Sequence, residues 1–217
     1  MVDVIHRSLR WLFFGLIVRP VIQIILGLNV SGREHLPIKG PAILAANHNS
    51  HLDTMVLMTL VSHRVLHRVR PVAAADYFLS NPTLAWFSTR IIGILPIARR
   101  RKCPNEDPLQ ACHEALDNGD ILIFFPEGTR GKPEQMSEFK SGIARLAQCQ
   151  PEVPVVPVFM HGLGKALPKG EALLVPFTVD VFVGESLRGA EHGDEFLVAL
   201  RQRLETLAEA KSTPAWD

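Results

Sequence analysis

The sequence predicts an α/β protein with a mixed, largely parallel central sheet flanked by helices. Short apolar runs alternate along the chain with segments whose apolar residues recur at helical spacing. Two of these runs, residues 121–125 and 153–160, are apolar almost throughout, which is typical of strands covered on both faces. No repeat, low-complexity tract or Gly/Ser/Pro-rich linker divides the 217 residues, so we expect one hydrophobic core.

Composition narrows the possible classes of protein. The formal net charge of +1 gives no overall electrostatic reason to expect nucleic acid as a partner. Cys103, Cys112 and Cys149 form no CxxC pair, which argues against a disulfide framework and a structural zinc site and favours a reducing, cytoplasmic environment. Basic residues cluster within 99–102 and 64–70, and such runs are usually a solvated surface.

The N-terminal segment, residues 11–28, is almost entirely apolar. A helix that crosses a membrane needs about 20 apolar residues without a central charge, whereas Arg19 and Pro20 stand in the middle of this one. A proline inside a helix costs about 3 kcal/mol, and the residue before it avoids helical geometry. We therefore expect two short apolar helices, over residues 4–18 and 20–28.

These two helices suggest a division of the chain into a helical hairpin over residues 1–28 and a second domain over residues 29–217. Trp11, Phe13 and Phe14 are suited to the acyl boundary of a membrane surface, with basic side chains near anionic headgroups. We predict monotopic or peripheral attachment of the hairpin to a membrane. Packing of both helices against the body of the protein is the alternative.

The next part of the chain predicts strands and helices in turn. Residues 42–46 are apolar and end at Asn47, which indicates a buried strand. Asp53 is at or near the N-cap of an expected helix over residues 53–61, and a proline in the first turn indicates a helix over residues 82–89. Weaker signals predict strands over residues 29–34, 69–73 and 93–97.

The second half has clearer periodicity. Leu109, Cys112 and Leu116 recur at helical spacing behind a cap at Asp107, so we expect a helix over residues 107–117. In sheets built this way, polar sites lie in the loops beyond the strand ends. The remaining expected elements are strands over 121–125, 153–160 and within 173–184, and helices over 142–149 and 194–210.

The first motif with chemical character, NHNSHLD, occupies residues 47–53. Histidine is suited to taking a proton near neutral pH, and a carboxylate on its other ring nitrogen fixes the tautomer that this needs. On a straight helix His48 and Asp53 would be about 140° apart, so they meet only if His48 lies in a turn and Asp53 begins the next helix. The predicted strand and helix supply this arrangement. A capping or packing role is the alternative.

The second motif, FFPEGTR at residues 124–130, also follows a buried strand. Gly128 permits close approach of the backbone, Pro126 restricts the turn, and Arg130 can grip a phosphate or carboxylate with two hydrogen bonds. Lys140 adds a second cation just before an expected helix N-terminus, which itself favours an anion. These features predict an anion-binding loop.

Together the motifs resemble the glycerolipid acyltransferase family, whose best-known members are the 1-acylglycerol-3-phosphate acyltransferases. The resemblance covers about residues 29–185 and rests on four blocks in the family's order. The residue after FPEGTR, often serine in this family, is Gly131 here. The blocks are His-x4-Asp at 48–53, a Gly-to-Arg block at 93–99, FPEGTR at 125–130 and an apolar, proline-containing segment at 155–158.

The resemblance implies an O-acyltransferase of phospholipid biosynthesis that forms phosphatidate. It would move a fatty acyl group from a thioester donor, acyl-CoA or acyl carrier protein, to the hydroxyl of lysophosphatidate. His48 would be the general base, oriented by Asp53, and no acyl-enzyme, metal or bound cofactor is expected. The resemblance further implies an acceptor site with arginine on the phosphate, formed by Arg99, Glu127, Gly128, Thr129 and Arg130.

The expected partners are a membrane lipid surface at its cytoplasmic face, a lysophospholipid acceptor and the thioester donor. Other acceptors remain open: glycerol 3-phosphate, another lysophospholipid, an amino-acid-derived lyso-lipid, or a phospholipid in transacylation. A non-catalytic lipid-binding protein is an alternative of another class. A metal-dependent hydrolase using His48, His51 and Asp53 is disfavoured because no second carboxylate cluster completes a site, and we expect His51 to serve in packing or support.

Overall fold

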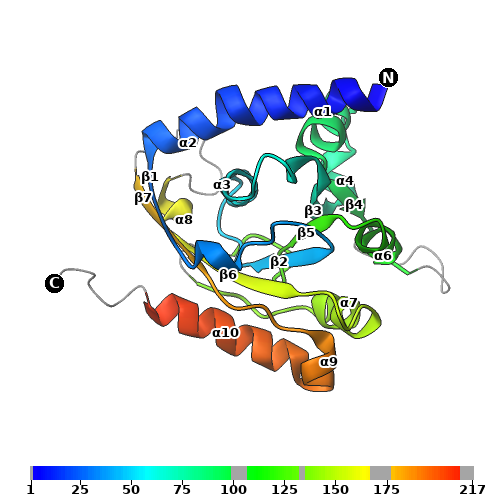
Figure 1. The fold of residues 1–217 in the computed structure, drawn as a ribbon, viewed down its shortest axis with the longest axis vertical. Helices are drawn as coiled ribbons and strands as arrows, with labels where there is room; N and C mark the ends of the chain where they lie inside the picture. Colours follow the sequence, from blue (N-terminus) through cyan, green and yellow to red (C-terminus); the bar gives the residue numbers. More distant parts are fainter. Residues whose placement is uncertain (1, 99–106, 132–134, 167–176, 211–217) are drawn as a thin grey trace.

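The computed structural model describes residues 2–98, 107–131, 135–166 and 177–210. A seven-stranded sheet with the order β1-β7-β6-β2-β5-β3-β4 forms its centre (Figure 1). Among the strand pairs described, β6 and β7 are antiparallel and the others parallel, which confirms the predicted mixed, largely parallel sheet. The strands are β1 (Leu26–Ser31), β2 (Ala42–Ala46), β3 (Val69–Ala74), β4 (Leu95–Ile97), β5 (Ile121–Phe124), β6 (Val155–His161) and β7 (Phe177–Val183).

Helices cover both faces of this sheet. The N-terminal helix and α3 (Leu52–Leu60) lie over one face, and α7 (Gly142–Cys149), α9 (Gly189–His192) and α10 (Phe196–Ala210) lie over the other (Figure 1). The other α-helices are α4 (Ala75–Phe78), α5 (Pro82–Trp86), α6 (Gln110–Asp117) and α8 (Leu163–Ala166). A π-helical segment, η4 (Phe87–Ile92), continues α5, and short 3-10 turns are η2 (Arg33–His35), η3 (Leu66–Arg68) and η5 (Gly193–Glu195).

Strand β2 shows how the core is divided between the two faces. All five of its residues are fully buried. Side chains alternate along a strand, so Ala42, Leu44 and Ala46 join the cluster beneath the N-terminal helix, whereas Ile43 and Ala45 join the cluster beneath α7 and α10. The continuous apolar run in the sequence therefore marks a strand that is covered on both sides, as predicted.

The N-terminal region is a single helix, so the break expected at Pro20 does not occur. α1 (Val2–Leu12), a π-helical segment η1 (Phe13–Val18) and α2 (Arg19–Ile25) follow one another without a turn (Figure 1). Arg19 keeps helical dihedral angles (φ −61°, ψ −50°), and its N–H donates to the carbonyl of Phe14, five residues back. Such a widened turn is one of the local adjustments by which a helix accommodates a proline.

Packing explains why the helix continues through Pro20. Phe14, Val18 and Ile22 are buried in the same cluster as the sheet. Arg19 points inward as well, and its guanidinium donates to the carbonyls of Thr59 (3.1 Å) and Val61 (3.0 Å) at the end of α3. The central charge that argued against a spanning helix is therefore bonded to carbonyls at the C-terminal end of α3.

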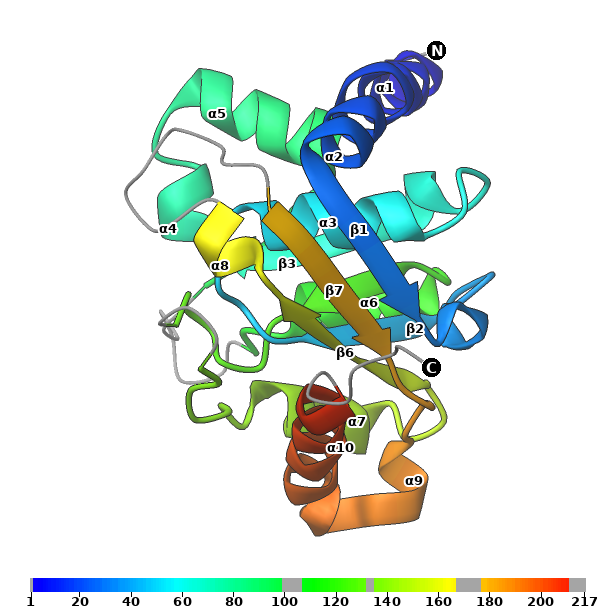
Figure 2. The same ribbon diagram turned by 90° about the vertical axis from the view of Figure 1, so that its left-hand side faces the viewer.

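This helix belongs to the same core as the rest of the chain, unlike the separate hairpin expected over residues 1–28. It runs directly into β1, which begins at Leu26 rather than in the predicted 29–34 and pairs with β7 (Figure 2). Its outward side is apolar and exposed: Leu16 is 70% and Ile24 82% exposed. The stretch Ile5–Ile25 is long and apolar enough to cross a membrane by length and composition, a test that core helices of soluble proteins also pass.

Candidate active site

The turn between β2 and α3 carries the first motif. Asn47, at the carboxyl end of β2, is buried, and its side chain makes two hydrogen bonds to the backbone of Met160 in β6. The amide nitrogen donates to the Met160 carbonyl (2.9 Å), and Oδ1 accepts from the Met160 N–H (2.8 Å). α3 follows with His51 at its N-cap, so Asp53 stands in the first helical turn. The start of the turn is thereby fixed to the neighbouring strand.

The structure brings His48 and Asp53 together across this turn. Nδ1 of His48 lies 2.9 Å from Oδ2 of Asp53, whose side chain is only 1% exposed. The same oxygen accepts the backbone N–H groups of Asn49 (2.6 Å) and Ser50 (2.9 Å). A single carboxylate oxygen thus holds both the turn and the imidazole.

This arrangement determines the chemistry available to His48. A carboxylate accepts hydrogen bonds, so the neutral imidazole carries its proton on Nδ1 and keeps its basic lone pair on Nε2. The ring stacks on Phe125 at a centroid distance of 4.0 Å and an interplanar angle of 16°. The side chain remains 19% exposed. The imidazole is therefore held on two sides and still accessible.

The loop after β5 carries the second motif and is bonded to the first. The N–H of Gly131 donates to the His48 carbonyl (2.9 Å), and the N–H of Lys140 donates to the Pro126 carbonyl (2.9 Å). Gly128 has φ +69°, the left-handed region that side chains rarely adopt. A Cβ there would also lie 3.1 Å from Lys140 Cδ. The backbone conformation therefore favours glycine here, and any larger side chain would also have to displace that of Lys140.

Glu127 has a different environment from the one the resemblance implies. Its side chain is 1% exposed, with Oε1 accepting the N–H of His48 (2.8 Å) and Oε2 accepting the N–H of Ser137 (2.7 Å). Both oxygens are therefore occupied by backbone donors from two other segments. This carboxylate positions the backbone of His48, a role that the residue order alone did not reveal.

Replacing Glu127 with glutamine tests this bracing role. One oxygen becomes an NH2 group that faces a backbone N–H, which leaves a buried donor unsatisfied. We expect the free energy of unfolding to fall by about 1–3 kcal/mol, measured by urea denaturation. Glu138→Gln, an exposed neighbour, is the matched control and should change stability by less than about 0.5 kcal/mol. Equal stability of the two variants would contradict the bracing role.

A cavity of about 550 Å³ opens at the carboxyl ends of β2, β3 and β5, where these two motifs meet. His48 stands on its wall together with two cations, Arg130 and Lys140. Most of the remaining wall is apolar or aromatic. The other lining residues are His51, Val72, Ala74, Tyr77, Phe78, Ile97, Ala98, Leu109, Phe124, Phe125, Pro126, Gly128, Thr129 and Gly142.

The other two blocks of the resemblance lie at different places in the sheet. Gly93 (φ +78°) precedes β4 at its amino end, whereas Ile97 and Ala98 at the other end of β4 line the cavity. Arg99, predicted to bind the acceptor, lies outside the described residues. The block at 155–158 is the part of the buried strand β6 that pairs with β2.

His51 is exposed, lines the cavity and stacks on Tyr77 at a centroid distance of 6.4 Å, and the packing or supporting role expected for it stays a prediction. Its pKa is lowered, first by partial burial and then by the nearby Arg130 and His48. Within the described part of the chain, no group of three or more His, Cys, Asp or Glu side chains is arranged to hold a metal ion. His51 is therefore a neutral, polar element of the cavity wall.

Comparison with known sequences identifies the family. The sequence model of the acyltransferase family matches residues 27–161, which include the His48 turn and the Glu127 loop. The chain belongs to the acyltransferase family. The match covers the sheet from β1 to β6.

Individual members of the acyltransferase family share about 30% of the aligned residues. A chloroplastic 1-acyl-sn-glycerol-3-phosphate acyltransferase of Arabidopsis thaliana is 30% identical over 188 residues, 86% of this chain and 49% of the relative. A 1-acyl-sn-glycerol-3-phosphate acyltransferase of Pseudomonas aeruginosa is 29% identical over 181 residues, 81% of this chain and 65% of the relative. The chain spans about half the length of the plant and algal relatives it matches.

A solved acyltransferase structure has the same fold. The 1-acyl-sn-glycerophosphate acyltransferase PlsC of Thermotoga maritima superposes with a TM-score of 0.76 at 22% identity. The superposition covers 95% of this chain and 81% of that one. The shared architecture therefore extends from the N-terminal helix through the sheet.

Proposed function

We propose that the chain is an O-acyltransferase that transfers a fatty acyl group from a thioester donor to the hydroxyl of lysophosphatidate, forming phosphatidate. The observation that carries this proposal is the His48–Asp53 pair beside a cavity that His48 lines. The same cavity is lined by basic side chains and by an apolar surface. The names of the relatives, 1-acyl-sn-glycerol-3-phosphate acyltransferases, support the choice of acceptor.

In the proposed reaction Nε2 of His48 takes the proton of the acceptor hydroxyl while the hydroxyl oxygen attacks the thioester carbon. Asp53 holds Nδ1 and stabilises the imidazolium that forms. When the carbon–sulfur bond breaks, the imidazolium returns the proton to the leaving thiolate, so no proton is gained or lost overall. General base catalysis of this kind contributes about 10²- to 10⁴-fold to the rate.

The acceptor site is proposed to use the cations of the same cavity. Arg130 binds the phosphate, with Lys140 as a second cation, because guanidinium and ammonium groups form strong charge-assisted bonds to phosphate oxygens. Gly128 and Thr129 line the cavity beside Arg130. Arg99 is retained as a further phosphate ligand from the family resemblance. The apolar wall accommodates acyl chains.

A covalent acyl-cysteine route is not needed for this reaction. Cys112 is fully buried, and burial raises the pKa of its thiol to about 12, so the nucleophilic thiolate is scarce at neutral pH. Cys149 is exposed near the end of α7 and is absent from the cavity lining. Direct attack by the acceptor hydroxyl is the simpler route.

The N-terminal helix supports a location at a membrane surface, proposed here as the cytoplasmic face. Its outer side exposes Leu16 and Ile24, while Phe14 and Ile22 are buried against the sheet. A helix with one side in the protein core cannot be surrounded by lipid. Monotopic attachment, with the outer side in the acyl boundary, fits this arrangement.

The direct test measures thiol release from acyl-CoA and from acyl carrier protein thioesters, with one acceptor present at a time. The acceptors are lysophosphatidate, glycerol 3-phosphate, other lysophospholipids and amino-acid lyso-lipids. Release that depends on lysophosphatidate supports the proposal, and dependence on another acceptor corrects the substrate. Release without any acceptor indicates a thioesterase. No release by folded, lipid-bound protein with either donor indicates a non-catalytic lipid-binding protein.

Replacing Arg130 with glutamine tests the phosphate site. Loss of a charge-assisted hydrogen bond of about 1.5–3 kcal/mol should raise KM for lysophosphatidate about 10- to 100-fold, with a smaller effect on kcat. Steady-state kinetics with varied acceptor provide the measurement. Arg145→Gln, an exposed arginine on α7 outside the cavity, should leave KM within about twofold. An unchanged KM for Arg130→Gln would remove Arg130 from the acceptor site.

A further inference from the structure

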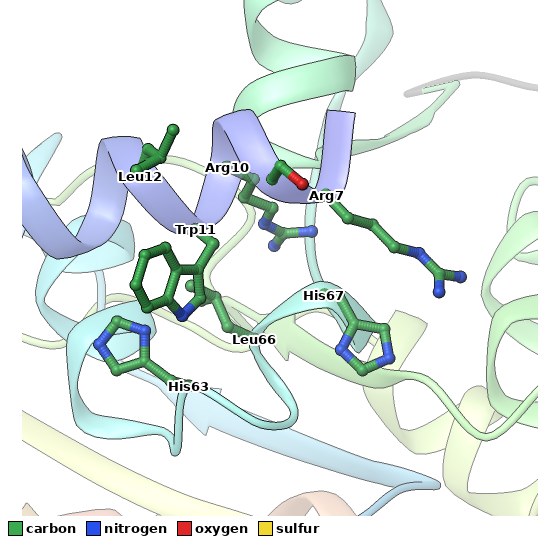
Figure 3. A pocket seen from close by; sticks show the side chains of 8 residues that line it. Arg7, Arg10, Trp11, Leu12, His63, Leu66 and His67 are labelled. Atoms are coloured by element: carbon green, nitrogen blue, oxygen red, sulfur yellow. The ribbon is translucent and has the colours of Figure 1, made fainter. Parts of the chain in front are cut away.

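A second cavity lies between α1 and the loop that contains η3, and the proposed reaction makes no use of it. It measures about 470 Å³, and an adjoining hollow of about 280 Å³ shares Arg7, Arg10 and His67 with it. In Figure 3, Arg10 and Trp11 point from the helix toward the loop, where His63 and His67 face them. The basic cluster noted in the sequence at residues 64–70 contributes to this wall.

This cavity lies at the amino ends of the parallel strands, whereas the His48 site lies at their carboxyl ends. Arg10 donates to the carbonyl of Val69, the first residue of β3. His48 follows the last residue of β2, and β2, β5 and β3 run parallel to one another. The start of β3 and the end of β2 therefore lie at opposite ends of these parallel strands. A ligand in one site cannot occupy the other.

Arg10 forms the floor of this second cavity and is unusually buried for a charged group. It is 4% exposed, and one guanidinium nitrogen is bonded to the Val69 carbonyl (2.6 Å). Within the described residues, its buried Nε has no hydrogen-bond partner. Gly93 makes room for the guanidinium, because a Cβ there would lie 2.5 Å from Nη1. A buried cation with an unsatisfied donor needs an acceptor.

The surrounding charges do not supply that acceptor. Arg7, Arg70 and Arg90 line the same hollow, and the described carboxylate close to them, Asp120, is bonded to Arg70 (3.1 Å). The pKa of His67 is lowered, first by burial and next by Arg7 and Arg68. The pKa of His63 is lowered by burial and by Arg19. The electrostatic potential in the cavity is therefore positive.

One side of the cavity is apolar and continuous with the outer face of α1. Trp11 and Leu12 line it and are themselves 53% and 43% exposed. The indole of Trp11 packs against His63 at a centroid distance of 5.8 Å. A ligand here meets arginines at its anionic end and apolar side chains at its other end.

We propose that this cavity binds a phosphate group, separately from the catalytic site, through Arg7 and Arg10. The two sources of that chemistry are the headgroup of an anionic phospholipid, whose acyl chains lie along Trp11 and Leu12, and free phosphate. In either case the anion offsets the positive charge of the buried Arg10 guanidinium. The site joins the N-terminal helix to the body of the protein through a bound anion.

The test titrates the full chain with short-chain phosphatidylglycerol below its micelle concentration and, separately, with inorganic phosphate. The ring signals of His63 and His67 in NMR spectra report binding. Without a membrane surface, general attraction of basic residues to anionic lipid does not contribute. The variants are Arg7→Gln, at an exposed position that tolerates substitution, and the control Arg64→Gln, an exposed arginine of the same loop that does not line the cavity.

We expect Arg7→Gln to weaken binding about tenfold, as for the loss of a charge-assisted hydrogen bond, and Arg64→Gln to weaken it less than twofold. Binding of phosphatidylglycerol alone assigns the site to a lipid headgroup, and equal binding of inorganic phosphate assigns it to free phosphate. Absence of histidine shifts with both ligands, or equal losses in the two variants, would overturn the proposal. The readout does not depend on acyl transfer, so failure of the proposed reaction leaves it intact.

Discussion

Replacing His48 with alanine is expected to lower kcat for acyl transfer about 10²- to 10⁴-fold, because the reaction loses its general base. The fold should survive, since the ring is partly exposed and the turn is held through backbone atoms of residues 48–50. Thiol release under saturating donor and acceptor provides the measurement. Circular dichroism on the same samples verifies folding.

A second histidine–carboxylate pair in the molecule provides the control for His48. His113 on α6 lies 3.5 Å from Asp107, which precedes that helix, and neither residue lines the cavity. His113→Ala should retain kcat within about twofold. A His48→Ala enzyme that keeps more than a tenth of the wild-type kcat would rule out His48 as the base.

Replacing Asp53 with asparagine is expected to lower kcat by up to about 10⁴-fold while leaving the fold intact. All three hydrogen bonds to this side chain are accepted by Oδ2, and within the described residues the buried Oδ1 has no partner. An asparagine oxygen can take the place of Oδ2, with its NH2 group in the place of Oδ1. The hydrogen-bond geometry then survives, but the negative charge that stabilises the imidazolium is lost.

The measurement for Asp53 pairs kcat with the midpoint of urea unfolding. We expect a large loss of kcat with a midpoint close to that of the wild type. Asp180→Asn, which makes the same chemical change in a side-chain pair with Asn29 on β7 and β1, should alter neither value appreciably. A joint loss of activity and stability in Asp53→Asn would show that the carboxylate serves the turn rather than the imidazole.

Much of the fold could be predicted because its signals are local. The buried strands β2, β5 and β6 appear in the sequence as apolar runs. The helical spacing of apolar residues predicts α6, although its N-cap is Leu109 and not Asp107. The N-terminal helix was harder to predict because Pro20 is a strong local signal for a break. Burial of Phe14 and Ile22 and the bonds of Arg19 to α3 outweigh it, and these are tertiary contacts.

The candidate site divides in the same way between local and long-range information. The approach of His48 to Asp53 could be predicted because both lie within one turn. The two bonds of Glu127 depend on segments at residues 48 and 137, which no local pattern relates to one another. The inward direction of the Glu127 side chain therefore became visible only with the structure.

The position of β1 at the edge of the sheet has a consequence for the order in which the molecule is completed. β1 is joined to the helix at the start of the chain, yet its partner β7 is separated from it by most of the sequence, so that Asn29 pairs with Asp180. On the ribosome the N-terminal helix therefore emerges long before the strand that anchors its end exists. During that interval the side of the N-terminal helix that carries Phe14, Val18 and Ile22 is not yet covered by the sheet. The chain can thus meet a lipid surface during its synthesis, before β7 pairs with β1.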